Sequence, residues 1–583
     1  MKRIFVLALA VALILSVVLV PASAQEAPEG EWLGTWDYTL LPEHHLNGFA
    51  ASGPNTNLGN IFRNLTELSP AFYVYASNEW IPLLGESWGF SDDGSYYELT
   101  LRSDATWSNG SAITADDVVT TYALGQILGW TQFNYVESVE KVDDYTVHFN
   151  FIEGQESLLA ERLILKEYIV ATDTYGDLAA EAMAVVESGA DAESEAWVAM
   201  ETTIQEFRPE EYIVSGPYGY TLDAVGDTFM TLTWQPNSVF SGSVNFGSIK
   251  IWKGETESTT PLVLSGEIAH ATNVYPPATV QSFVDEGLNI VTIPRGYGPA
   301  MLFNHTVYPW NVVEVRQAIA YVIDRDQNAF LTNGLGATGT DYMSGLLDNV
   351  TPSLMNEEDV AALNLYEQNF EEAERLMGEA GFTRNADGIW EDADGNTAGG
   401  EYKFPAEFAD FAGASQDAIA QLNEFGFDLV ARAIPWQENA ADIGDGNFEV
   451  SIWSWGSSAP FAQSNFRNPV LRWSDPGLMI DLENYEYSGG TVNLSEMIAA
   501  SSAGLDVEAQ REVTGDVALI INETMPFIPL NVIISAEPFN IDMISGLPEA
   551  GDPILQNPTG SDHFVIIGIL QGTLSPGPGQ MME

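Results

Sequence analysis

"WIPLLGESWGFSDDGSYYELTLRSDATWSNGSAITADDVVTTY" occupies residues 80–122 and joins a turn, a β-rich segment, a second turn and a helix start. The turn residues "SDDG" precede "SYYELTLRSDATW", whose composition favours a strand. Thr114 is followed three residues later by Asp117, the pattern of a helix N-cap with an acidic third position. A strand and a helix this close together indicate a mixed α/β fold.

The same mixture continues outward from this stretch. "YTVHFNF", at residues 145–151, alternates like a strand, and residues 312–323 carry apolar side chains at helical spacing. "FEEAERLMGEAGF" predicts an amphipathic helix that ends at Gly381, and Asp394-Gly395 predicts the centre of a hairpin. With 583 residues, the chain is long enough for two to four α/β domains with several sheets.

The first residues predict export. Lys2 and Arg3 precede an apolar run from Ile4 to Val20, and a small-residue motif ends at Ala24. This pattern is typical of a secretory signal peptide, residues 1–24, while the length of the run leaves an uncleaved membrane anchor as an alternative. The protein is therefore expected in the periplasm or outside the cell, associated with the cell surface.

Cysteine content and charge exclude several classes of protein. The chain has no cysteine, which excludes disulfides, thiolate metal sites and a lipid-modified cysteine anchor. It carries 83 acidic residues against 20 lysines and arginines, a formal charge of −63, so nucleic acid and anionic membranes are excluded as partners. Two interpretations stay open: adaptation to high salt, where screening weakens self-repulsion, or a merely acidic exported protein.

Short chemical motifs do not indicate an enzyme. "GESWG" at residues 85–89 matches a nucleophile elbow around Ser87, but a turn and a strand follow it instead of the required helix. No Gly-Lys pair exists for an ATP-binding P-loop, and "DADGN" has Thr397 and Lys403 where a calcium loop needs Gly and Glu. His44 and His45 have no partner histidine at metal-binding spacing. We therefore predict no catalytic residue, no metal and no cofactor.

Three long stretches, in order, resemble the family-5 extracellular solute-binding proteins, the oligopeptide- and dipeptide-binding class of ABC importers. Residues 80–122 are similar to the family's P-x-L-A-E-S-W, D-G and T-A-x-D-V-V elements. "VSGPYGYTL" (214–222) resembles its G-T-G-P-Y element, and "LFNHTVYPWNVVEVRQAIAYVIDRD" (302–326) resembles its V-R-Q-A-I…I-D-R segment. In the last stretch, Arg316 and Arg325 are expected to pair with acids and fix helix ends.

The resemblance implies a two-lobed, type II periplasmic-binding-protein (Venus-flytrap) α/β fold with an extra inserted domain. Domain I is expected at residues 25–70, 207–303 and 525–583, domain II at 71–206 and domain III at 304–524. The lobes are expected to close on a small-molecule ligand about a hinge and to present it to a membrane permease. The protein is expected to act as a monomer.

The resemblance also implies where the ligand lies. Peptide binders of the family use an aspartate for the α-amino group, and the matching region, residues 453–460, has serines at that place. A peptide ammonium would lack its partner there, whereas aromatic faces with nearby hydroxyl-binding groups suit sugar rings. Along "FEVSIWSW", both tryptophans fall on the face that ends at a Gly-rich loop. The predicted ligand-binding residues are Trp453, Trp455, Ser457, Trp473, Tyr297 and Asn304.

Oligopeptide and oligosaccharide therefore both remain possible ligands, since the resemblance favours peptide and the residues favour sugar. A secreted glycoside hydrolase and a surface structural protein are the alternative classes. Product release from oligosaccharides would indicate the hydrolase, and the absence of ligand-dependent closure would indicate the structural protein.

Overall fold

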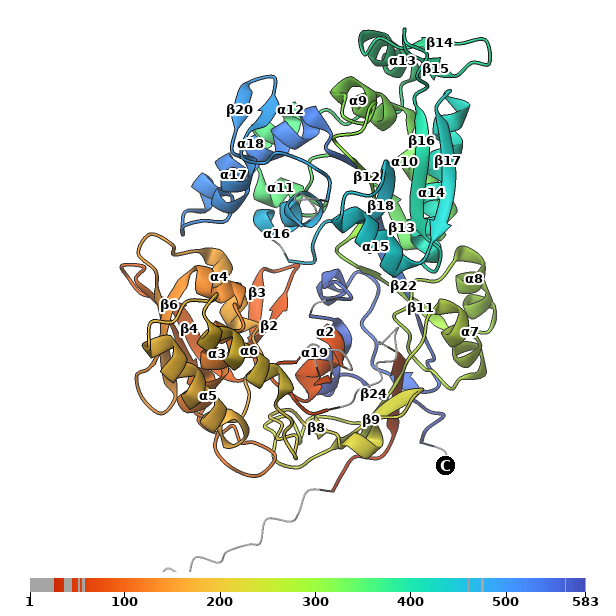
Figure 1. Ribbon diagram of the computed structural model, residues 1–583. Coiled ribbons are helices and arrows are strands. Elements are labelled where there is room, and N and C mark those ends of the chain that lie inside the picture. The colour runs from red at the N-terminus through yellow and green to blue at the C-terminus, as the bar shows by residue number, and fades with distance from the viewer. Residues whose placement is uncertain are drawn as a thin grey trace, which may run out of the picture.

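A computed structural model describes residues 26–35, 45–50, 53–54, 58–459, 461–472, 477–560 and 562–581. They form two α/β lobes, one above the other in Figure 1, so the two-lobed α/β fold expected from the sequence is confirmed. The signal peptide expected at residues 1–24 lies outside the described residues. Within the described ranges, no helix is long and apolar enough to cross a membrane.

The lower lobe contains a sheet built from segments that are far apart in the sequence. Its strand order is β1 (Glu31–Thr35), β10 (Ser248–Trp252), β9 (Phe229–Trp234) and β8 (Tyr218–Gly219). The C-terminal helix α19 (Phe564–Leu570) packs in the same core, and every residue of it is buried. Near the chain ends, the Glu31 amide donates a 2.7 Å hydrogen bond to Gln580 Oε1, so the first and last segments close one domain.

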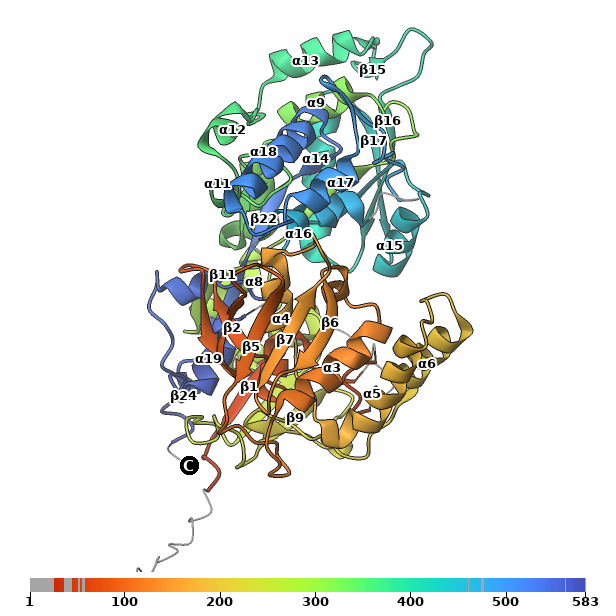
Figure 2. The same cartoon turned by 90° about the vertical axis from the view of Figure 1, so that its left-hand side faces the viewer.

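A second sheet of the lower lobe contains the stretch quoted first. Its order is β4 (Gly85–Phe90), β5 (Tyr96–Leu101), β7 (Thr146–Phe151) and β6 (Val136–Lys141). Helices α3 (Ala115–Ile127), α5 (Thr172–Glu187) and α6 (Glu195–Glu206) lie to one side of this sheet (Figure 2). The predicted strands are confirmed by β5 and β7, whose burial alternates residue by residue.

Local end signals of this lobe are also confirmed. Thr114 and Asp117 form a complete capping box at the start of α3, with the Thr114 amide donating to Asp117 Oδ2 at 2.8 Å. Strand β4 contains "GESWG", and a turn follows it before β5, so Ser87 lies in a strand and not at an elbow. The hydrolase motif is thus excluded by its backbone context.

The upper lobe is built on one mixed five-stranded sheet. Its order is β17 (Asp428–Ile434), β16 (Gly399–Pro405), β18 (Val450–Trp455), β12 (Gly298–Phe303) and β21 (Phe527–Pro529). Helices α9 (Val313–Val322), α14 (Ala409–Glu424) and α18 (Val507–Thr524) pack in this lobe (Figure 1). Strand β18 is central and buried on both faces, with Val450 and Ile452 in one core and Trp453 and Trp455 in another.

Two more local predictions hold in this lobe. Helix α13 (Phe370–Glu379) is followed by Gly381 at φ +88°, a left-handed conformation that suits glycine. The turn at Asp394-Gly395 is present, and Glu391 bridges Thr397 across it. Beyond the turn the chain leaves the hairpin, because β16 pairs in parallel with β17 and β18.

The prediction that Arg316 and Arg325 pair with acidic side chains is wrong. Arg316 donates to the carbonyls of Trp310, Thr524 and Met525, and Arg325 donates to four other backbone carbonyls. Both side chains are buried, and burial lowers the pKa of Arg316 to about 10. Because a guanidinium has five donors, each can satisfy several carbonyls at helix and loop ends, which keeps the expected scaffold role.

The chain passes between the lobes twice, side by side. Strand β11 (Asn289–Pro294) pairs with β22 (Asn531–Phe539), while the next strands toward the upper lobe are β12 and β21. We call residues 294–298 and 529–533 the hinge ribbon. Two hydrogen bonds join its halves, from the Arg295 amide to Ile533 O at 3.1 Å and from the Ile533 amide to Tyr297 O at 3.0 Å.

Candidate ligand-binding site

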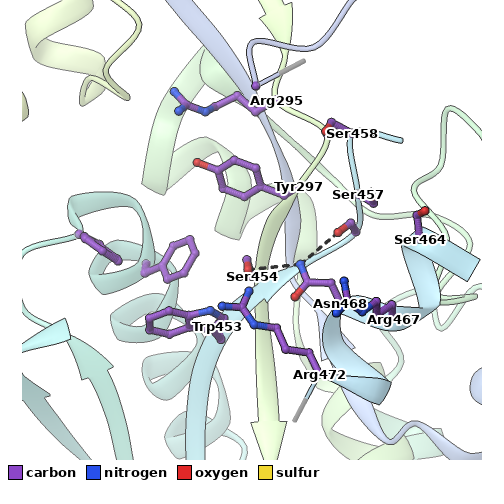
Figure 3. Close-up of a pocket in the computed structure, with 15 residues that line it drawn as sticks. Arg295, Tyr297, Trp453, Ser454, Ser457, Ser458, Ser464, Arg467, Asn468 and Arg472 are labelled. Atoms are coloured by element: carbon purple, nitrogen blue, oxygen red, sulfur yellow. Dashed lines mark hydrogen bonds between the residues drawn. The ribbon is translucent and has the colours of Figure 1, made fainter. Parts of the chain in front are cut away.

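A cavity of about 800 Å³ lies beside the hinge ribbon (Figure 3). Three segments of the upper lobe form most of its wall: residues 408–411 at the start of α14, 453–458 at the end of β18, and 464–472. Gly560 contributes from the C-terminal segment of the lower lobe. A cavity of this size, formed where two lobes meet, has the dimensions of a typical small-molecule site.

Aromatic side chains form one wall of the cavity. Phe411 meets the Trp453 ring edge to face at 6.3 Å between centroids, and Phe408 lies 6.4 Å from Trp453. Tyr297 enters from the hinge ribbon, where the Arg295 guanidinium lies 5.6 Å from its ring centroid. Only 9% of Trp453 is exposed, so this tryptophan both packs in the core and lines the cavity.

The loop after β18 is held close to the hinge ribbon. Gly296 has φ +73°, and a Cβ on it would lie 2.6 Å from Ser458 Cα. Asn468 donates hydrogen bonds to Gly456 O at 3.1 Å and to Ser454 Oγ at 3.4 Å, drawn as dashed lines in Figure 3. Glycine is thus needed for the close approach, and the amide of Asn468 fixes the strand end against the following helix.

Three arginines line the cavity, and no aspartate or glutamate among the described residues does. Arg295 comes from the hinge ribbon, where its Nη1 donates to Thr272 O at 2.6 Å. Arg467 begins η5 (Arg467–Leu471), the turn that continues α16 (Ala462–Phe466), and Arg472 directly follows η5; both side chains are exposed. Burial and the neighbouring Arg467 charge lower the pKa of Arg472.

A smaller chamber of about 220 Å³ shares part of this wall and has the opposite charge. It is lined by the carboxyl-bearing residues Glu255, Glu407 and Asp410, together with Arg295 and Tyr297. Burial raises the pKa of Asp410, an effect that Arg295 partly offsets, and burial with the neighbouring acids raises the pKa of Glu255. The two chambers share Arg295, Tyr297, Phe408 and Phe411, and the carboxyl-bearing residues named above line the smaller one.

The predicted residues fall into three groups. Trp453, Ser457 and Tyr297 line the cavity together. Trp455 does not, because its ring is buried and its Nε1 donates to Asn531 O at 3.2 Å. Asn304 is also buried away from the cavity, where its amide donates to Gly446 O at 2.9 Å.

Trp473 lies outside the described residues. Sequence reasoning did not find several further residues of the cavity wall, because no local pattern marks them. They are Phe408, Phe411, Ser454, Arg467, Asn468 and Arg472.

Main-chain contacts hold the lobes together on the side of α17 (Leu494–Ala500). Ser157, just before α4 (Leu158–Leu165) of the lower lobe, forms a parallel bridge with Gly504 of the upper lobe. The Gly504 amide donates to Glu156 O at 2.8 Å, and the Leu158 amide donates to Gly504 O at 3.3 Å. The described arrangement is therefore one in which the lobes touch.

Side chains add two contacts between the lobes beside the cavity. Tyr75 Oη, from the lower lobe, donates to Ser458 O in the cavity loop. The same hydroxyl accepts a 2.7 Å hydrogen bond from Arg162. Tyr135 Oη donates to Gln463 Oε1 at 3.1 Å. The cavity wall is thus tied to both lobes.

His270, Glu537 and His563 form the candidate metal cluster of the described residues, with ligand atoms within 4.8 Å of one another. The Val565 amide donates to His563 Nδ1, so the neutral ring carries its proton on Nε2, which lies 3.1 Å from Glu537 Oε2. His270 Nε2 lies 2.7 Å from the same oxygen. Although burial opposes it, the two imidazoles hold the pKa of Glu537 below its usual range. These three side chains therefore fit a hydrogen-bonded cluster that stabilises the core better than they fit a metal site.

Relatives with known names match short segments of the chain. A periplasmic alpha-galactoside-binding protein of Rhizobium meliloti is 34% identical over 104 residues, 16% of this chain and 15% of that protein. The peptidoglycan-binding protein YepA of Agrobacterium fabrum is 32% identical over 117 residues, 18% of this chain and 19% of that protein. The chain thus aligns with less than a fifth of the length of these relatives.

Solved structures match nearly the whole chain. A periplasmic oligopeptide-binding protein of an oligopeptide ABC transporter from Thermotoga maritima has a TM-score of 0.74 at 19% identity, covering 94% of this chain and 98% of that one. Its mannohexaose-bound crystal structure has a TM-score of 0.71 at 19% identity, with 95% and 99% covered. The oligopeptide-binding protein AppA of Bacillus subtilis, in complex with a nonapeptide, has a TM-score of 0.64 at 15% identity, with 91% and 98% covered. At these identities the likeness shows the fold.

The family is shown by the sequence itself. The sequence model of the bacterial extracellular solute-binding proteins, family 5 (middle region), matches residues 79–475, which is more than half of the chain. This range includes the first stretch that resembled the family and most of the cavity wall. The chain therefore belongs to the family-5 bacterial extracellular solute-binding proteins.

Proposed function

We propose that the protein is the substrate-binding component of an ABC importer, which captures an oligomeric solute between its lobes and delivers it to a membrane permease. The observation that carries this proposal is the cavity beside the hinge ribbon, walled by the upper lobe and by Gly560 of the lower lobe. A ligand that contacts both lobes favours the closed arrangement, which a permease can recognise. We further propose that the exported protein acts as a monomer.

The division into three domains stays a proposal, and we now place the borders of domain III by the strands that pair within its sheet. Because β12 and β21 pair within the upper sheet, we propose that domain III begins near residue 298 and ends near residue 529. Domain II, residues 71–206, then carries the sheet of strands β4, β5, β6 and β7. Domain I carries helix α19 and the sheet of strands β1, β8, β9 and β10. The hinge ribbon is the proposed axis of closure.

An oligosaccharide is the ligand that the main cavity supports best. Tyr297, Phe411 and Trp453 offer aromatic surface, and Ser457 and Asn468 offer polar groups beside it. Such a pairing suits sugar rings, which present apolar C–H faces together with hydroxyls. One relative is named for binding alpha-galactosides, and one similar structure holds mannohexaose.

An oligopeptide is the second candidate, favoured by the acidic chamber. The carboxyl groups of Glu255, Glu407 and Asp410 lie where a ligand ammonium would find opposite charge, although Ser457 and Ser458 replace the aspartate expected nearby. A peptide would then place its amino end in the smaller chamber and its remaining residues in the larger one.

A thermal-shift screen of neutral oligosaccharides, uronate oligosaccharides and di- to pentapeptides tests the proposed function. A true ligand at a hundredfold excess over its Kd should stabilise the protein by roughly 2.7 kcal/mol. Small-angle scattering with and without that ligand should show a more compact protein when it is bound. If no solute of either class raises the melting temperature, or if oligosaccharides are hydrolysed, the importer function is refuted.

A further inference from the structure

A tyrosine of the lower lobe holds the wall of the main cavity through the main chain. Tyr75 directly follows β2 (Ala71–Val74), and its hydroxyl donates to the carbonyl oxygen of Ser458. Ser458 lines the cavity (Figure 3), and the hinge ribbon approaches it closely at Gly296. The loop after β18 is therefore held at one residue by both the hinge ribbon and the lower lobe.

Arg162 of helix α4 fixes the direction of that hydrogen bond. Its Nη2 donates to Tyr75 Oη at 2.7 Å, and its guanidinium carbon lies 4.8 Å from the Tyr73 ring centroid. Because a guanidinium carries donors and no acceptor, the Tyr75 hydroxyl must accept from Arg162. The single hydroxyl proton is then directed to the Ser458 carbonyl, and two hydrogen bonds that run in one direction strengthen each other.

Asp562 holds Arg162 in that position. Its buried carboxylate lies 3.4 Å from Arg162 Nη2, forms an ion pair with Lys166 and accepts the Tyr73 amide at 3.0 Å. Although burial opposes ionisation, the two cations hold the pKa of Asp562 below its ordinary value. A buried charge that lost its partner would be strongly destabilising, which favours a single arrangement of these side chains.

The segment before α19 connects this group of side chains to the cavity and to the hinge ribbon. Asn557 Oδ1 accepts the Tyr75 amide at 3.0 Å. The Thr559 amide donates to Pro294 O at 2.9 Å, where the hinge ribbon begins. Gly560 lines the cavity. One short segment thus contacts the tyrosine, the hinge ribbon and the cavity.

We propose that Tyr75 is the clamp that retains a captured solute, and that Arg162 and Asp562 are positioning residues for this clamp. The inference rests on the proposed importer function and names how the same site is held closed. Because the clamp bonds to the main chain of the cavity wall, its contribution is the same for every solute that binds. Because it joins the two lobes, it slows their opening and therefore the release of the solute.

Stopped-flow kinetics followed by tryptophan fluorescence test the proposal. The probes are mannohexaose, raffinose and penta-alanine, so that two sugars and one peptide represent both ligand classes. We expect Tyr75→Phe and Arg162→Gln each to raise the dissociation rate about fivefold to tenfold, the effect of one lost hydrogen bond. The association rate should change by less than about twofold, and the increase in dissociation should be equal for every probe that binds.

A double variant shows whether Arg162 acts through Tyr75. If it does, Tyr75→Phe combined with Arg162→Gln releases each probe no faster than Tyr75→Phe alone, because the hydroxyl that Arg162 orients is already absent. A merely structural role of Arg162 would instead add its own effect. Asp562→Asn keeps the shape of the side chain and removes its charge, so it should raise the dissociation rate by a smaller factor.

The matched control is Arg102→Gln, in the lower lobe, where the arginine pairs with Asp104 at 2.6 Å. It should release every probe as the parent protein does. Melting temperatures of the unliganded variants show whether each has folded.

Spin labels measure the closure itself. Because the chain has no cysteine, Val142→Cys and Val430→Cys, both at exposed positions, place one label on each lobe. In this background, Tyr75→Phe and Arg162→Gln should shift the distance between the labels to longer values, and the control variant should not.

Three results would overturn the proposal while leaving the importer function standing. They are a dissociation rate that Arg162→Gln leaves unchanged, effects of the two single variants that multiply in the double variant, and label distances that match the parent protein in both single variants. Failure of every sugar and every peptide to bind the parent protein would instead refute the importer function itself, and this inference with it.

Discussion

Gly298, the first residue of β12, is the position where the hinge ribbon is packed most tightly. A Cβ added there would lie 1.8 Å from Asn531 O, 2.8 Å from Asn531 C and 3.1 Å from Val532 Cα. All three atoms belong to the backbone of the other crossing segment, so no side chain can rotate away. Since ordinary contact distances are about 3.5 Å, Gly298→Ala requires the two segments to separate by roughly 1.7 Å.

The cost follows from what that separation disturbs. Overpacking against well-packed neighbours costs up to about 3 kcal/mol. The shift also strains the two hydrogen bonds between Arg295, Tyr297 and Ile533, each worth about 1 kcal/mol. Reduced entropy of the unfolded chain returns about 0.4–1 kcal/mol. We therefore expect Gly298→Ala to lower the free energy of unfolding by about 3–4 kcal/mol in urea titrations followed by tryptophan fluorescence.

A glycine without neighbours provides the control. Gly89, in β4, has nothing within 4 Å of an added Cβ, so Gly89→Ala should not destabilise the protein and should raise the free energy of unfolding by about 0.4–1 kcal/mol through the same entropy effect. If Gly298→Ala remains within about 0.5 kcal/mol of the parent protein, the two crossing segments do not touch as described. The derivation of the hinge from their contact would then be wrong.

Other expected outcomes concern acid stability, closure, the two tryptophans and salt. Burial and the Arg316 charge lower the pKa of His305 to about 3, so the unfolded chain takes up the proton first as the pH falls below 6.5. His305 should therefore remove about 2 kcal/mol of stability between pH 7 and pH 5, a loss that urea titrations of His305→Gln should not show. Tyr75→Phe deletes the hydrogen bond to the cavity loop and should weaken ligand binding about fivefold to tenfold; unchanged affinity and scattering would mean that this bond plays no part in closure. Trp455→Ala should cost about 3–5 kcal/mol of stability while the folded fraction still binds ligand, whereas Trp453→Phe should lower affinity, and the reverse pattern would contradict the description of the wall. Thermal melts should show a gain in stability from low to molar salt if the −63 charge reflects a saline habitat, and no gain if it does not.

Local signals were enough to predict much of the fold. The capping box of Thr114 and Asp117, the alternation in β5 and β7, and the end of α13 before Gly381 each depend on residues within a few positions of one another. Such short-range preferences act before any tertiary contact forms, so they can be read directly from the sequence. The family resemblance supplied the arrangement of the lobes, which no local rule contains.

The site was predictable only in part. The alternation of side chains along a strand shows which face a residue lies on, but not what that face contacts in the folded protein. Trp453 and Trp455 lie on the same face of β18, as expected, but only Trp453 reaches the cavity, since Trp455 meets Asn531 on β22. Arg316 and Arg467 are both arginines, a residue type that is rare in this chain. The first satisfies backbone carbonyls and the second lines the cavity, a difference set by contacts with segments distant in the sequence.

Residues 295–297 serve two purposes at once, since they connect the lobes and form part of the cavity wall. Any rotation of one lobe against the other must therefore change the shape of the pocket at Tyr297, and any misfit in the pocket must act on the rotation. If the lobes rotate about this ribbon as proposed, the dimensions of the bound ligand set the angle between the two lobes. A permease that recognises only that angle would reject a solute that binds well but holds the lobes at a different angle.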